Sequence, residues 1–189
     1  MSVELLKILE AEIGPALIEK SSDNGDDTAV IDPAAWLRAA RFLRDDPRCD
    51  MQMMVDLCAV DFPHREPRFD VVMHLHSLSK GHRLRLKTRV GDRNGDGAKL
   101  DSVVSVWAGA NWFERETFDM MGISFLGHPD LRRILMYPEF VGHPLRKDYP
   151  ANRIQPLVPF RQGYEKVPPF DQSEGMSFGR QTFRTGKAD

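Results

Sequence analysis

Two histidines and an aspartate are the residues of this chain best spaced to bind a metal ion. Polar and apolar residues alternate from Phe69 to Ser77, which predicts a strand that carries Asp70, His74 and His76 on one face. Imidazole and carboxylate groups in this arrangement can bind zinc or iron. Histidines also occur commonly on a partly wet or interfacial sheet face. A stand-alone metal-dependent enzyme is therefore an alternative hypothesis and not the preferred one.

A second pattern is similar to the start of a calcium-binding loop. Residues 92–97 read DRNGDG, which fits the opening of an EF-hand loop. The twelfth position of such a loop needs a bidentate glutamate, and here it is Val103. The segment before the loop is also predicted to be a strand and not a helix. We therefore predict a polar turn without a calcium ion.

Other signatures of chemistry are missing from the sequence. It contains neither a GxGxxG fingerprint nor a P-loop, so it has no ordinary dinucleotide or phosphate site. It has two cysteines, whereas an iron–sulfur cluster usually takes four. A net charge of −2 argues against binding to nucleic acid. We therefore expect no catalytic residues and no cofactor on this chain.

The composition is that of a soluble globular protein. The 189 residues are 41% hydrophobic and 29% charged, enough for one domain with a core and some additional chain. The N-terminus lacks the pattern of a signal peptide, and no apolar run approaches the roughly 18–20 residues that span a bilayer. If the protein works at a membrane, we expect another chain to hold it there.

Residues 1–107 are predicted to form a two-layer α+β domain, with helices on one face of a mixed sheet. Helices are expected over residues 2–13 and from the N-cap Asp32 to Pro47. The expected strands are residues 16–20, 28–31, 51–62, 69–77 and 82–90, with 51–62 central because it is apolar on both faces. The last strand has an outward basic face, formed by Arg83, Arg85, Lys87 and Arg89. This face is either solvated or contacts an acidic partner.

Residues 108–150 are dense in aromatic and charged residues. A helix is expected from Asn111 as N-cap to Gly122, with Glu114 in a capping box and Arg115 spaced to pair with Asp119. The triplet Gly-His-Pro occurs at 127–129 and again at 142–144, and the first copy can open a short helix through Ile134. So many charges beside aromatic residues indicate partly buried ion pairs. The segment is either a self-contained structural corner or a docking surface that completes the domain.

Residues 151–189 are rich in proline and show no periodicity, so they cannot build a core of their own. They retain five aromatic residues, from Phe160 to Phe183. We therefore predict an extended C-terminal arm that lies over a partner.

The 108–150 segment closely resembles a known family. Residues 114–123 read ERETFDMMGI, residues 127–135 GHPDLRRIL and residues 142–150 GHPLRKDYP. These motifs resemble the signature of the C subunit of respiratory NADH-quinone oxidoreductase (complex I), the thirty-kilodalton subunit in mitochondria. The resemblance implies a structural subunit of the peripheral arm that binds no flavin, cluster or quinone itself. FMN, iron–sulfur clusters and quinone would be carried elsewhere in the complex.

The resemblance also implies partners and a location. The chain would form a hetero-oligomer with the quinone-site subunit and the iron–sulfur subunits, on the cytoplasmic side of the bacterial inner membrane. Membrane contact would occur only through those partners. We expect the interface to include Glu114, Arg115, Glu116, Asp119, Arg132, Arg133, His143, Arg146, Lys147 and Asp148. Alternatives are the equivalent subunit of an energy-converting hydrogenase or of a quinone reductase with another donor, or a free assembly or adaptor protein.

Overall fold

The computed structural model describes residues 2–95 and 97–155. Its main sheet has the strand order β1-β2-β5-β4-β3, and the members are β1 (Leu17–Asp23), β2 (Asp26–Ile31), β3 (Met53–Asp61), β4 (Phe69–His76) and β5 (Arg83–Val90). β2 and β5 are parallel and the other neighbours are antiparallel, so the sheet is mixed. The predicted α+β class is confirmed.

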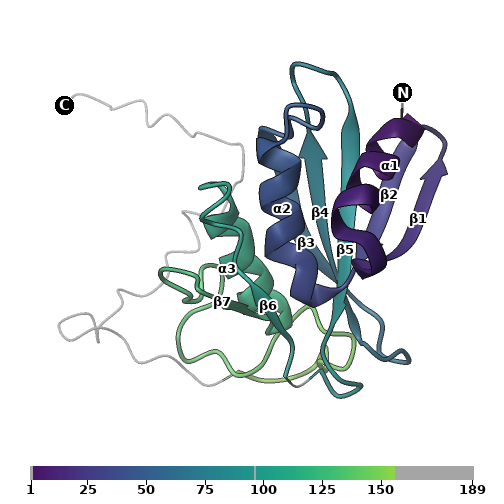
Figure 1. The fold of residues 1–189 in the computed structure, drawn as a ribbon. Helices are drawn as coiled ribbons and strands as arrows, with labels where there is room; N and C mark the ends of the chain where they lie inside the picture. The colour runs from purple at the N-terminus through teal and green to yellow at the C-terminus, as the bar shows by residue number, and fades with distance from the viewer. Residues whose placement is uncertain (1, 96, 156–189) are drawn as a thin grey trace, which may run out of the picture. The chain divides into compact units, whose positions relative to one another are not determined.

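Two helices cover one face of this sheet. α1 (Ser2–Ile13) and α2 (Trp36–Asp45) lie side by side in front of the strands (Figure 1). Their apolar stripes are buried, with Leu9, Trp36 and Leu43 fully enclosed. Opposite them, β5 buries Leu84, Leu86, Thr88 and Val90, which is the alternation predicted from the sequence.

Short 3₁₀ turns introduce two of these elements. One turn (Gly14–Ala16) leads from α1 into β1. The other (Pro33–Ala35) precedes α2, and there the Asp32 carboxylate accepts a hydrogen bond from the Ala34 amide at 2.8 Å. Asp32 is therefore an N-cap, as predicted, and it caps a 3₁₀ turn that continues into the helix.

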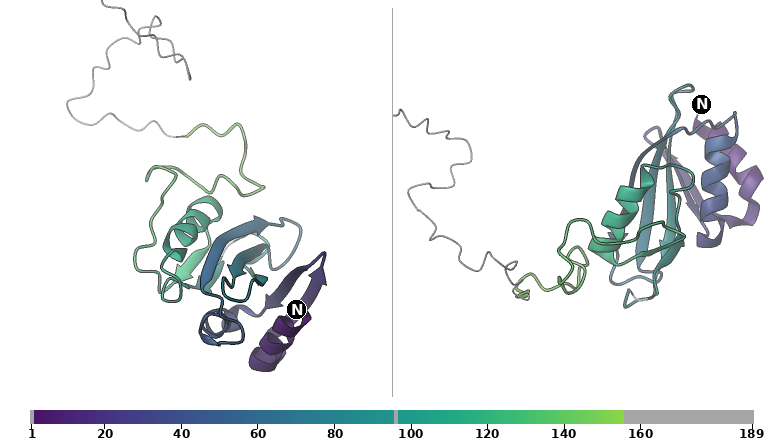
Figure 2. Two further views of the ribbon diagram at one scale, coloured as in Figure 1. Left: turned by 90° about the horizontal axis from the view of Figure 1, so that it is seen from above. Right: turned by 90° about the vertical axis from the view of Figure 1, so that its left-hand side faces the viewer.

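The position predicted for β3 is wrong. β3 is an edge strand and not a central one, and three of its apolar side chains, Met53, Val55 and Val60, are 41–48% exposed. α3 (Ala110–Met121) packs against this edge strand, on the opposite side of the sheet from α1 and α2 (Figure 2). A strand that is apolar on both faces shows the same sequence pattern whether it lies between two strands or at an edge with a helix packed on it. The pattern therefore could not predict whether β3 is a central or an edge strand.

The sequence did not predict a second, small sheet. β6 (Lys99–Asp101) and β7 (Ser124–Leu126) pair in parallel, and α3 lies between them in the sequence. Three-residue strands are too short to show a period, which explains the omission. The small sheet and α3 together form the support from which residues 127–155 leave the domain.

Residues 127–155 contain no regular helix or strand. The short helix expected from Pro129 to Ile134 is therefore absent. Residues 151–155 are irregular and largely exposed, and the remainder of the predicted C-terminal arm, from residue 156, lies outside the described residues. Within the described residues, no helix is both long enough and apolar enough to cross a membrane.

Candidate docking segment

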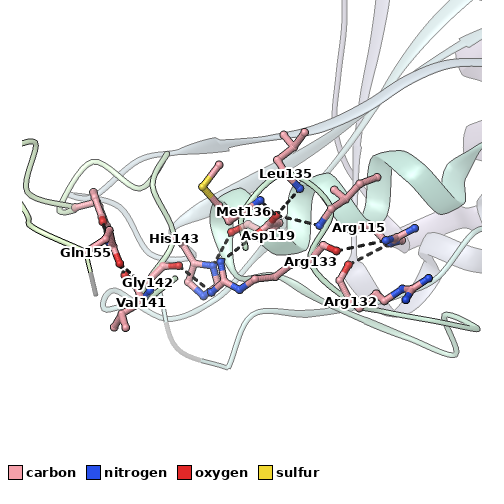
Figure 3. Close-up of polar contacts among 12 residues, drawn as sticks. Arg115, Asp119, Arg132, Arg133, Leu135, Met136, Val141, Gly142, His143 and Gln155 are labelled. Carbon is pink, nitrogen blue, oxygen red and sulfur yellow. Dashed lines mark hydrogen bonds and ion pairs between the residues drawn. The ribbon is translucent and has the colours of Figure 1, made fainter. Parts of the chain in front are cut away.

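Asp119 is the anchor that gives the irregular segment its path. Its carboxylate is fully buried at the end of α3, and Oδ2 accepts hydrogen bonds from the amides of Ile134, Leu135 and Met136 at 3.1, 2.9 and 2.8 Å (Figure 3). Oδ1 accepts from Arg133 Nη1 at 2.8 Å. Burial acts to raise the pKa of Asp119, but the three amides and Arg133 outweigh it, so the pKa lies below its usual value. One ionised side chain thus replaces the backbone partners that a helix or sheet would have supplied.

The pairing expected between Arg115 and Asp119 does not form. Arg115 instead donates to the carbonyl oxygens of Arg132 at 3.1 Å and Arg133 at 3.3 Å. Arg133 takes the place beside Asp119 and also donates to the carbonyl of Gly142 at 3.0 Å. Arg133 lies fourteen residues from Asp119 in sequence, but the loop brings it onto the same face of α3. Arg133 therefore binds Asp119 in place of Arg115.

The two Gly-His-Pro triplets place one histidine at each end of α3. His128 accepts from the Asp130 amide through Nδ1, so its Nε2 donates to the carbonyl of Asn111 at 3.2 Å. His143 Nδ1 donates to the carbonyl of Asp119 at 2.9 Å. Burial lowers the pKa of His143, which favours its neutral form. The repeated motif is therefore a pair of clamps on one helix.

A second anchor ties the segment to the main sheet. Arg68, only 2% exposed, donates from Nε and Nη2 to the two oxygens of Asp61 at 2.7 and 2.8 Å. Its Nη1 donates to Asp148 at 2.8 Å, and Asp61 also accepts from the Lys147 amide at 2.7 Å. The sequence analysis did not single out Arg68 or Asp61. A lone arginine before an apolar strand gives no signal of a partner eighty residues away.

Arg146 connects the same region to the loop that resembled a calcium site. It donates to the carbonyl of Met121 at 2.6 Å and to that of Gly95 at 3.1 Å. The side chain of Asp92 accepts from the Asn94 amide at 2.9 Å, as in an ordinary polar turn. Gly95 is needed because an added Cβ would lie 3.0 Å from the Phe69 ring. The predicted polar turn is confirmed, and the carbonyl of Gly95 within it accepts a hydrogen bond from Arg146.

Glu114 has a different role from the predicted capping box. α3 begins at Ala110 with Gly109 as N-cap, so Asn111 lies inside the helix. Glu114 is fully buried and accepts from Ser102 Oγ and the Val103 amide, both at 2.7 Å. Burial raises its pKa to about 7, although the hydrogen bonds from Ser102 and Val103 act to lower it. It fastens α3 to the residues that follow β6.

The predicted interface residues mostly bind within the chain. Seven of the ten side chains make bonds that shape the segment, namely Glu114, Arg115, Asp119, Arg133, His143, Arg146 and Asp148. Arg132 is exposed and pairs with Asp130 at 3.0 Å, and Glu116 and Lys147 have exposed side chains. The charges therefore build a structural corner. Contact between these residues and a partner stays a prediction.

The corner also presents large apolar side chains to solvent, beside its exposed charged ones. Six large hydrophobic residues between 112 and 154 are 45–93% exposed, and we call them the exposed apolar set: Trp112, Leu126, Leu135, Val141, Leu145 and Ile154. The guanidinium of Arg115 lies over the Trp112 ring at 5.3 Å, which holds this indole in place. Exposed large apolar side chains in a segment held by buried hydrogen bonds favour a protein–protein interface.

The alternative metal site is not supported by the geometry. Within the described part of the chain, no group of three or more His, Cys, Asp or Glu side chains is placed to hold a metal ion. His74 and His76 do lie on one face of β4, as predicted, but Asp70 pairs with Arg65. Its carboxylate is therefore already engaged.

Comparisons with known proteins agree on one family. The family model described as "Respiratory-chain NADH dehydrogenase, 30 Kd subunit" matches residues 29–155. The C subunit of NADH-quinone oxidoreductase from Xanthobacter autotrophicus is 48% identical over 148 residues, covering 78% of this chain and 69% of that protein. The corresponding protein from Roseiflexus castenholzii is 45% identical, and the match covers 84% of this chain and 89% of that protein.

Solved structures share the fold. The trypsin-resistant fragment (1–134) of Nqo5 aligns with a TM-score of 0.56 and 25% identity, over 69% of this chain and all of the fragment. A chain of the membrane-bound sulfane sulfur reductase, an archaeal respiratory membrane complex, aligns with a TM-score of 0.66 over 88% of this chain and 98% of its own length. Its identity is 24%, so this second likeness concerns the fold alone.

Proposed function

This chain belongs to the family of the respiratory-chain NADH dehydrogenase 30 kDa subunit, the C subunit of NADH-quinone oxidoreductase, and we propose that it is a structural, non-catalytic member of that complex. In this proposal it carries no cofactor. It binds the quinone-site and iron–sulfur subunits of the peripheral arm and keeps them in register. Electron transfer between centres depends steeply on distance, so a rigid scaffold has functional value without reacting groups of its own.

The fixed path of residues 132–148 is the observation that carries the proposal. An irregular segment with exposed apolar side chains would collapse or fluctuate unless its backbone were held. Asp119, Arg68 and Arg146 each bind groups of this segment or the chain it packs on, so buried and half-buried charges fix its shape. Preorganisation of this kind lowers the entropic cost of binding a partner. The exposed apolar set would then supply the contact area, with Trp112 as the principal anchor.

The proposed setting is the cytoplasmic side of the bacterial inner membrane, with membrane contact only through partner subunits. The fold also occurs in the sulfane sulfur reductase complex, so fold alone does not identify the electron donor. NADH-quinone reductase activity of the purified complex separates the proposed assembly from one that is supplied by another donor.

The test compares Trp112→Ala with Ile18→Ala in the full chain, expressed in its own host. Both side chains are large and more than half exposed, but Ile18 lies on β1 at the far edge of the sheet. We expect Trp112→Ala to lower the amount of assembled complex at least several-fold, as removal of an interface tryptophan costs about 2 kcal/mol or more. NADH-quinone turnover per assembled complex should stay close to that of the wild type.

Two outcomes would contradict the proposal. One is normal assembly of the Trp112→Ala chain with lost turnover, because a residue that acts in catalysis would behave in this way. The other is recovery of the wild-type chain alone, without iron–sulfur or quinone-site subunits, after mild solubilisation of membranes. The Ile18→Ala control guards against a general loss of folding.

A further inference from the structure

The second Gly-His-Pro copy places an imidazole beside a guanidinium. His143 donates from Nδ1 to the carbonyl of Asp119 at 2.9 Å, so Nε2 of the neutral ring carries no proton (Figure 3). An added Cβ at Gly122 would lie 2.5 Å from both this Nε2 and Nη2 of Arg146, so the two nitrogens are close neighbours. A neutral imidazole suits this position, because a proton on Nε2 would bring a second cation against Arg146.

Residues 142–148 also complete the C-terminal end of α3. The last carbonyls of a helix have no partner within the helix and need one from outside it. The last three carbonyls of α3 find partners in this stretch, in the order Asp119 with His143 Nδ1 at 2.9 Å, Met120 with the Leu145 amide at 3.2 Å and Met121 with Arg146 Nε at 2.6 Å. Separation of the imidazole from the guanidinium would therefore remove partners from the helix end as well.

The charged groups around His143 come from its own segment and from α3. Burial is the largest influence on the pKa of His143 and lowers it, and the cations Arg146 and Arg133 act in the same direction. The carbonyl and the carboxylate of Asp119 on α3 act in the opposite direction, but they are outweighed. Because the closed segment disfavours the proton and the released segment would not, proton uptake must favour release.

We propose that His143 is a pH-sensitive latch: proton uptake at Nε2 places two cations side by side and releases residues 142–148 from the end of α3. An ordinary histidine side chain gains its proton near pH 6.5, so the latch is closed above this pH and opens as the pH falls below it. The consequence for a partner rests on the proposed function. The hold of this segment on a neighbouring subunit weakens in acid and returns when the pH rises.

Hydrogen exchange of the full chain at pH 7 and pH 5, corrected for intrinsic rates, tests the latch. The Leu145 amide bonds to α3 next to the latch, and its protection in the wild type should fall about fivefold or more, the effect of two like charges about 4 Å apart in water. His143→Asn keeps a donor in place of Nδ1 but cannot ionise, so its protection should not depend on pH. His64→Gln, at an exposed loop position, should respond as the wild type does.

The acidic groups of this region do not imitate the effect. Hydrogen bonds hold the pKa of Asp119 below its usual value despite burial, and the hydrogen bond from Arg68 lowers the pKa of Asp148, so both stay ionised at pH 5. Glu114, whose pKa is about 7, gains its proton over the same range. Its protonation favours the folded state and so acts against a loss of protection.

Two exchange results would overturn the latch. One is unchanged protection of the Leu145 amide in the wild type between pH 7 and pH 5, and the other is an equal loss in His143→Asn. If that variant does not fold, an NMR titration of the wild type decides. His143 should gain its proton at a lower pH in the folded chain than in the urea-unfolded chain, together with a change at the Leu145 amide, and equal midpoints would exclude the latch.

The purified complex tests the consequence for a partner. Washing at pH 5.5 should release several-fold more of the wild-type chain than of the His143→Asn chain. Equal release of the two chains would overturn the regulation of docking. Absence of the wild-type chain from the complex at pH 7.5 would overturn the proposed function instead, a result that the exchange measurements on the separate chain do not depend on.

Discussion

Arg68 and Asp61 form a two-pronged ion pair, with Nε to Oδ1 at 2.7 Å and Nη2 to Oδ2 at 2.8 Å, and both side chains are almost completely buried. The pair joins the end of β3 to the residue before β4. Because Asp148 and the Lys147 amide bind the same two side chains, it also joins the main sheet to the second Gly-His-Pro copy.

Arg68→Met should destabilise the full chain by about 3–5 kcal/mol, because the Asp61 carboxylate would stay buried without its partner. Urea unfolding of the purified chain gives the value. Arg48→Met is the matched control, since the Arg48–Asp46 pair is exposed at the arginine and its loss should change the free energy of unfolding little. Removing both charges, with Arg68→Met and Asp61→Leu together, should recover part of the loss. A single-variant cost equal to that of the control would contradict the role of Arg68 as an anchor.

Asp119→Asn should loosen residues 134–136 without unfolding the domain. The amide group cannot accept from Arg133 and from three backbone amides at once, so a charge-assisted set worth about 1.5–3 kcal/mol is lost. Hydrogen exchange of the Ile134, Leu135 and Met136 amides should become roughly ten- to a hundredfold faster. Asp130→Asn, at an exposed pair with Arg132, should leave these rates unchanged. Equal rates in both variants would show that another contact holds the loop.

Glu114→Gln should remove the loss of folding stability that the wild type shows as the pH rises. The unfolded carboxyl ionises near 4.5, whereas the buried group keeps its proton until its pKa of about 7. Folding of the wild type therefore becomes less favourable as the pH rises from about 4.5 to 7, by about 3 kcal/mol in total. The stability difference between Glu114→Gln and the wild type should grow in favour of the variant across this window and level off above it. Glu116→Gln, on the exposed side of α3, should follow the wild type, and parallel curves for all three proteins would exclude the effect.

Gly122 and Gly127 share a φ of +78° but have different surroundings. An added Cβ at Gly122 would lie 2.5 Å from both Arg146 Nη2 and His143 Nε2, whereas nothing lies within 4 Å at Gly127. Gly127→Ala should therefore show only the backbone cost of a left-handed residue, about 1–2 kcal/mol. Gly122→Ala should be clearly less stable in thermal unfolding, because the clamp by His143 and the Arg146 contact must move. Equal melting temperatures would mean that these side chains are free to shift.

Much of the main domain could be predicted because the patterns that indicate its helices and strands involve residues close together in the sequence. The apolar stripes of α1 and α2, the cap at Asp32 and the alternation of β5 each depend on residues within a few positions of one another. The α+β class and the mixed sheet follow from the order of these elements. The position of β3 was wrong because strand order depends on contacts between distant residues, and the three-residue strands β6 and β7 lie below the length at which a pattern is visible.

For the docking segment, the sequence by itself determined the family resemblance and the presence of charged groups that need buried partners. The motifs from 114 to 150 carry the resemblance to the thirty-kilodalton subunit family, and the density of charge beside aromatic residues predicted buried ion pairs. Only the tertiary structure decided the pairings: Arg133 and not Arg115 binds Asp119, and Arg68 meets Asp148 across eighty residues. A side chain's type determines that a buried charge needs a partner, but the partner is whichever group the fold brings within hydrogen-bonding distance.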